Sequence, residues 1–170
     1  MKYIHRGLLS SVLAAALLTP GVPACAAPPA TLSITIGSAL LCQDQLNSKY
    51  FYDYLFIAFG KPYKAERGAY WFSTSRDRRS GSNIWCLQVS DILVNDSNSP
   101  ADFIGAVFNA TPQALADAIT HNTGFRFNVA NTTQKYALLQ SQTGSVIAYA
   151  GTQAKIYCAK SKYLVPSLPN

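Results

Sequence analysis

The sequence predicts an α+β fold, an antiparallel sheet of about six to seven strands with two helices packed on one face. Helical spacing of apolar residues occurs in two separate stretches, and short β-rich stretches fill most of the remaining chain. The last four of these stretches are separated only by brief turns. Such turns favour an antiparallel meander, because parallel strands need longer crossover connections.

The first 26 residues have the three parts of a secretory signal peptide. Lys2 and Arg6 precede an apolar run over residues 7–18, which is shorter than the roughly 20 residues that span a bilayer. The small residues around Cys25 favour cleavage before Ala27, and lipidation of Cys25 is the alternative. We therefore expect one globular domain over residues 27–170 in the periplasm or outside the cell, with no membrane span.

The first expected elements are a strand and a long helix. Residues 31–36 alternate polar and apolar side chains, which predicts a short strand. Residues 38–59 predict one helix, capped by Ser38 and ended by Gly60. Its apolar positions recur three or four residues apart, at Cys42, Leu46, Tyr50, Tyr54 and Ile57.

A hairpin and a further strand are expected next. Residues 69–74 and 84–94 read as its two strands, and the polar residues 80–83 supply the turn between them. Residues 103–108 predict a third strand. The tip of the hairpin carries a group of arginines, Arg76, Arg78 and Arg79.

The second helix has the clearest limits in the sequence. Thr111 is a good N-cap, Pro112 suits the first helical position, and Gly124 suits the left-handed closing conformation. Four further strands are expected, over residues 125–129, 135–140, 145–150 and 154–159. The tail from about Lys160 is expected to be unstructured.

Three cysteines remain after cleavage before Ala27, so one disulfide and one thiol are expected in an oxidising compartment. Each pairing of Cys42, Cys86 and Cys158 is open. We favour Cys42–Cys158, because it joins the first long helix to the last strand. It also leaves Cys86 as a buried thiol among apolar neighbours.

The positive charge of the chain is concentrated in one segment. The formal charge of +6 becomes +4 when Lys2 and Arg6 leave with the leader, and residues 61–79 alone hold six basic and two acidic side chains. A local field of this kind favours an acidic protein or an acidic envelope component as partner. A net charge of +4 is modest for a nucleic-acid-binding protein, which argues against that class.

The candidate binding residues lie in this basic segment, where arginine beside an aromatic ring can hold a carboxylate, a phosphate or a sugar. They are Arg67, Trp71, Arg76, Arg78 and Arg79. The alternative is that these charges only keep the hairpin soluble and prevent edge pairing.

The sequence offers few groups for chemistry. His121 is the only histidine after the leader and falls in the last turn of a predicted helix, where it favours the helix dipole. No metal-ligand set or common catalytic motif is present in the sequence, and no cofactor is implied. We therefore expect a non-catalytic exported binding protein, such as an inhibitor, an immunity-type factor or an envelope-associated module.

An enzymatic alternative rests on residue order. Glu66, the arginines that follow it and His121 resemble the glutamate, arginine and histidine set of small secreted microbial ribonucleases. This resemblance implies that Glu66 takes the 2′-hydroxyl proton, that an arginine holds the phosphate and that His121 protonates the leaving oxygen. The resemblance covers order only, and His121 departs from the pattern because it ends a helix.

Overall fold

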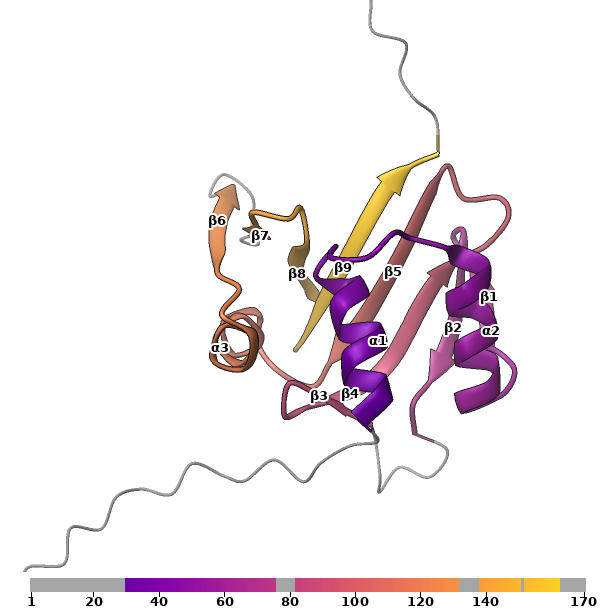
Figure 1. Ribbon diagram of the computed structural model, residues 1–170, viewed down its shortest axis with the longest axis horizontal. Coiled ribbons are helices and arrows are strands. Elements are labelled where there is room, and N and C mark those ends of the chain that lie inside the picture. Colours follow the sequence, from indigo (N-terminus) through magenta and orange to yellow (C-terminus); the bar gives the residue numbers. More distant parts are fainter. Residues whose placement is uncertain (1–29, 76–81, 132–137, 151, 163–170) are drawn as a thin grey trace, which may run out of the picture.

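A computed structural model describes residues 30–75, 82–131, 138–150 and 152–162 (Figure 1). Within these residues it is an α+β structure with nine strands and three helices, so the predicted class is confirmed and the predicted numbers were too low. The expected leader, most of the expected tail and the three hairpin arginines, Arg76, Arg78 and Arg79, lie outside the described residues.

The helices are α1 (Ala30–Leu40), α2 (Ser48–Phe59) and α3 (Pro112–Thr123). The strands are β1 (Lys64–Glu66), β2 (Ala69–Ser73), β3 (Asn83–Ile84), β4 (Leu87–Asn95), β5 (Ala101–Phe108), β6 (Phe127–Asn131), β7 (Leu138–Ser141), β8 (Val146–Ala150) and β9 (Gln153–Ser161). Their order in the sheet is β1-β2-β4-β5-β9-β8-β7-β6, and β3 pairs with β4. Every pairing among the described strands is antiparallel.

All three helices bury side chains in one core on the same face of the sheet. Figure 1 shows α1 and α2 in front of the central strands. The helices contribute Leu32, Ile36, Leu40, Phe51, Leu55, Leu115 and Ile119 to this core. The sheet contributes Phe72, Ile92, Ala106, Ile156 and Ile147, which follow one another in register across paired strands. Burial of this apolar surface is the main force that holds the two layers together.

The expectation of a strand over residues 31–36 was wrong, because these residues belong to α1. The polar and apolar alternation is real, but Leu32, Ile36 and Leu40 are also four residues apart and all three are buried. A helix places this set on one face toward the sheet. The helix propensity lost at Ser, Thr and Ile is only a few tenths of a kcal/mol per residue, so burial outweighs it.

The expected single helix over residues 38–59 is two helices. The chain leaves α1 at Leu40, and Cys42 has a left-handed backbone with a φ of 57°. The helix α2 begins after Asn47, whose side chain accepts a hydrogen bond from the Tyr50 amide at 3.0 Å. Asn47 is therefore the N-cap in place of Ser38. The end at Gly60 is confirmed.

The hairpin expected over residues 69–94 is confirmed as the pairing of β2 with β4, but its second strand is interrupted. Ile84 pairs with Leu87, so Trp85 and Cys86 form a two-residue turn, with φ values of 51° and 64°. Two positive φ angles are typical of the type I′ turn of tight hairpins. Trp85 is buried against the Phe108 ring, with 5.8 Å between the ring centroids.

The helix α3 and the meander after it follow the sequence prediction closely. The Thr111 hydroxyl accepts a hydrogen bond from the Ala114 amide at 3.2 Å, and Gly124 closes the helix with a φ of 79°. The strands β6, β7, β8 and β9 pair in succession. The strand β9 continues through Lys160 to Ser161, where an unstructured tail was expected, because its last residues pair with the start of β5.

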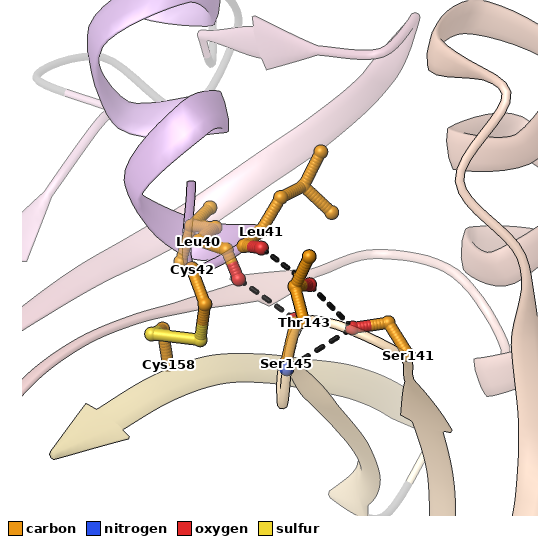
Figure 2. The surroundings of a disulfide bond; sticks show 7 residues. All are labelled: Leu40, Leu41, Cys42, Ser141, Thr143, Ser145 and Cys158. Atoms are coloured by element: carbon orange, nitrogen blue, oxygen red, sulfur yellow. Dashed lines mark hydrogen bonds between the residues drawn. A yellow bond between two sulfur atoms is a disulfide. The ribbon is translucent and has the colours of Figure 1, made fainter. Parts of the chain in front are cut away.

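The predicted disulfide Cys42–Cys158 is present and fixes the end of α1 to β9 (Figure 2). Beside it, the Ser145 hydroxyl donates to the Leu40 carbonyl, and the Thr143 hydroxyl donates to the Leu41 carbonyl, each at 2.7 Å. Carbonyls at a helix end have no partner within the helix. The turn between β7 and β8 supplies these partners.

The expectation of a free buried thiol at Cys86 was wrong. Cys86 lies exposed at the tip of the β3–β4 turn and is disulfide-bonded, and none of the described cysteines is free. A turn tip faces away from the core, which explains the exposure.

No helix in the described residues combines the length and the apolar character that crossing a bilayer requires.

The Cys42–Cys158 disulfide is expected to contribute strongly to stability, because 116 residues separate its cysteines. In the chain-entropy model a loop of this length is worth about 5 kcal/mol, and measured losses are typically about 2–5 kcal/mol. The double variant Cys42→Ala with Cys158→Ala should lower the free energy of unfolding in urea by an amount in this range. An unchanged urea midpoint would show that the noncovalent contacts of α1 alone fix it to the sheet.

The bond at Cys86 predicts that this sulfur is not a free thiol in the oxidised protein. Denatured, unreduced protein should carry no label at Cys86 after treatment with a thiol reagent, as read by peptide mass spectrometry. Reduced protein, in which Cys86 should be labelled, is the control. Labelling of Cys86 without reduction would contradict the bond.

Candidate binding surface

The face of the sheet opposite the helices carries a second, smaller apolar cluster. Ala69, Leu93 and Val107 are buried there, and Trp71 and Phe103 pack against them. Trp71 pairs with Lys64 on one side and Leu93 on the other, and Val107 pairs with Lys155. Partners in register lie on the same face of a sheet, so these side chains share one surface. No described helix covers this cluster.

Two lysines converge on the ring of Trp71. The distance from the ring centroid is 4.8 Å for Lys64 Nζ and 5.8 Å for Lys155 Nζ. Because β4 and β5 lie between β2 and β9, the indole and the Lys155 side chain extend toward each other over these two strands. Cations at this distance from an indole are attracted by its electron-rich face. We call Lys64, Trp71 and Lys155 the Trp71 surface.

The two lysines differ in their electrostatic partners. Lys64 Nζ lies 2.7 Å from Glu66 Oε1, and this hydrogen bond lowers the pKa of the Glu66 carboxyl. Lys155 has no carboxylate at ion-pair distance among the described residues, and burial lowers the pKa of its ammonium. A half-buried ammonium without a counter-ion is an unfavourable arrangement that an anion from outside would relieve.

The Trp71 indole N–H is also left without a partner. Its Nε1 atom is buried and has no hydrogen-bond acceptor within the described chain. A buried donor without an acceptor costs roughly 1–3 kcal/mol, so most proteins avoid it. The arrangement therefore does not maximise stability, and such departures are commonest where a surface has another role.

Arg67 lies exposed at the turn between β1 and β2. Arg67 and Gly68 have φ values of 54° and 78°, and the flanking Glu66 and Ala69 pair with each other. This is a second two-residue turn of type I′. The Gly68 carbonyl accepts a hydrogen bond from the Asp96 amide at 2.9 Å, which fixes the turn against the end of β4. The backbone of Arg67 is therefore held at the sheet edge, directly after the strand that carries Lys64.

The structure does not bring Glu66 and His121 together. Glu66 lies on β1, the edge strand, and is exposed beside Lys64. His121 is exposed in the last turn of α3, which packs on β8 and β9. Four strand spacings separate β1 from β9, which is roughly 19 Å. No described arrangement therefore supports a shared active site for these two residues.

Sequence reasoning identified Trp71 but missed the lysines beside it. Lys64 was counted in the charge of residues 61–79 without a role of its own, and its pairing with Trp71 requires the strand β1, which was not expected. Lys155 is distant in sequence, and only the register of β5 with β9 places it on this face. Its alternation with the buried Ala154 and Ile156 is the one local signal that it faces away from the core.

A tyrosine and an aspartate fix the chain just before β1. The Tyr63 hydroxyl donates to Asp91 Oδ1 at 3.0 Å, and the Tyr63 amide donates to the Trp71 carbonyl at 3.0 Å. Burial, followed by the hydrogen bond to Asp91 and its negative charge, raises the pKa of Tyr63 to about 12. These contacts hold β1, and therefore Lys64, in place beside Trp71.

The described residues contain no group of three or more histidine, cysteine or carboxylate side chains that could hold a metal ion. The chain matches no model of a known protein family, no curated protein and no solved structure. The geometry of the described residues is therefore the only basis for a functional conclusion.

The raised pKa of Tyr63 predicts a loss of stability at high pH. The folded value of about 12 exceeds the ordinary value of 10.0, so the neutral phenol favours the fold. Its contribution is complete below about pH 10 and is lost as the pH rises to about 12. Tyrosinate absorbance of the wild type minus that of Tyr63→Phe should show a midpoint near 12, and Asp91→Asn should lower it. A midpoint near 10 in the difference curve would contradict this contact.

Proposed function

We propose that the chain is an exported, non-catalytic binding protein that holds an acidic partner on the Trp71 surface. The observation that carries this proposal is Lys155, a half-buried ammonium next to an indole with no counter-ion among the described residues. The Cys42–Cys158 disulfide is compatible with the oxidising compartment that export would provide.

The chemistry of this surface suits a carboxylate beside an apolar group. A partner carboxylate would pair with Lys155, while an apolar side chain next to it would pack on Trp71 and Phe103. Arg67 at the sheet edge adds a planar guanidinium that can hold a second carboxylate in two hydrogen bonds. The net positive charge of residues 61–79 would speed the approach of an acidic partner.

The partner class that fits is a protein with an exposed acidic segment. An inhibitor or an immunity-type factor would use such a surface against one target, and an envelope-associated module would use it against an acidic envelope component. Arg76, Arg78 and Arg79 of the basic segment, which the structure does not describe, are proposed to bind the same acidic partner.

The variant Lys155→Met tests this proposal because methionine keeps the unbranched apolar stem and removes the charge. Loss of a charge-assisted contact should weaken binding by about 10- to 100-fold. The melting temperature should stay the same or rise, because a half-buried ammonium without a partner costs free energy in the folded state. Binding should be measured by calorimetry with a synthetic peptide in which glutamates flank one tryptophan.

Matched controls separate this role from general electrostatics. Lys49→Met removes an exposed lysine from α2, on the other face of the sheet, and should leave binding of the peptide unchanged. Arg67→Asn removes the charge while keeping a residue that accepts a positive φ, so it should weaken binding without loss of stability. An equal loss of affinity in Lys155→Met and Lys49→Met would show that only the net charge of the protein matters. That result would overturn the proposal.

A further inference from the structure

A cavity lies on the helix-covered side of the sheet, where α2 begins. It has a volume of about 520 Å³ and is formed by the first two turns of α2, the β4–β5 connection and the chain just after β9. Small-molecule sites commonly have volumes of roughly 300–1000 Å³. It is separate from the Trp71 surface, because Tyr70 and Trp71 follow each other on β2 and point to opposite faces.

The floor of the cavity is a partly buried polar cluster. Ser48 Oγ lies 2.6 Å from both Asn95 Oδ1 and Asp102 Oδ1, and Asn95 Nδ2 donates to Asp102 Oδ1 at 3.2 Å. Asn95 is only 5% exposed, and its Oδ1 also accepts from the Phe103 amide at 2.9 Å. A serine hydroxyl has one proton, so it can donate to only one of the two oxygens. The floor therefore has more acceptors than donors.

Both ammonium groups around the cavity already lie close to a carboxylate. Lys49 Nζ lies 2.6 Å from Asp53 Oδ2, and Lys162 Nζ lies 3.9 Å from Asp102 Oδ1. Asp96 adds a third carboxylate, so carboxylates outnumber ammonium groups. An anionic ligand would be repelled by the net negative charge of the lining. An apolar ligand would displace water from the carboxylates and ammonium groups without replacing its hydrogen bonds. The lining instead suits neutral groups that both donate and accept hydrogen bonds.

Two tyrosine rings form the apolar part of the lining. The Tyr52 and Tyr70 ring centroids are 5.0 Å apart, with 64° between the ring planes. Tyr52 also contacts the buried Phe72 ring, which fixes its position. A sugar ring has hydroxyl groups at its rim and C–H groups on its faces, so it matches carboxylates beside aromatic rings. We propose that this cavity binds a saccharide unit, with Asp53, Asp102 and Lys162 holding hydroxyl groups.

The test is a titration of the whole exported protein, followed by amide chemical shifts in NMR. The probes are maltotriose and the trimer of β-1,4-linked N-acetylglucosamine, with spermidine and sulfate as cationic and anionic comparisons. At least one trisaccharide should shift the amides of Tyr52, Tyr70 and Asp102 with a Kd of about 1 mM or tighter. Larger shifts from spermidine or sulfate than from either sugar would overturn the proposal, as would no shift at these amides.

Substitutions then assign the contact. Asp53→Asn changes an exposed carboxylate outside the polar floor and should weaken the sugar contact by about tenfold without changing the melting temperature. Asp117→Asn removes an exposed carboxylate from α3 and is the control that should change nothing. Asp102→Asn should also weaken binding. If Asp102→Asn fails to fold, Asp53→Asn alone still tests the proposal. Wild-type affinity in Asp53→Asn and Lys162→Met would contradict the proposed contacts.

Discussion

The attachment of α1 to the sheet is the constraint on which the rest of the structure depends. This helix contacts β3, β5 and β9, and its buried face fills the middle of the core. Its end is held three times, by the Cys42–Cys158 disulfide and by the hydroxyls of Ser145 and Thr143 on the last carbonyls. These contacts join the beginning of the described chain to its last strands. The helix α1 thereby joins the two ends of the sheet, the hairpin of β2 and β4 and the meander from β6 to β9, in one core.

Because the described helices pack on one face of the sheet, the opposite face is left without a helical cover. Strands alternate their side chains, so β2, β4 and β5 must place residues on a face that no described helix covers. Trp71 packs against the buried Ala69, Leu93 and Val107 there, and the ammonium groups of two lysines lie beside its indole. The same arrangement protects a small apolar cluster from water and presents charge next to an aromatic ring. The proposed binding role therefore uses the same atoms as this structural role.

The sequence predicted best what is encoded locally. The limits of α3 follow from Thr111, Pro112 and Gly124, whose effects act within a few residues. The helix α1 was mistaken for a strand because alternation and helical spacing coincide over so few residues, and only the core decides between them. The disulfide was predicted from the elements that it joins. The convergence of Lys155 on Trp71, and of Ser48, Asn95 and Asp102 in the cavity floor, depends on register and packing across distant segments, which no local pattern contains.

The two proposed sites are separate surfaces of shared strands. On β2, Tyr70 lines the cavity and Trp71 lies on the opposite face, and on β5, Asp102 and Phe103 divide in the same way. A substitution on either strand lies next to residues of both sites, so its effects are assigned to one site less directly. Lys155 on β9 and Asp53 on α2 each belong to one site only. The sheet backbone separates these two side chains. If Lys155→Met weakened only peptide binding and Asp53→Asn weakened only sugar binding, the protein would have two sites and not a single site disturbed at a distance.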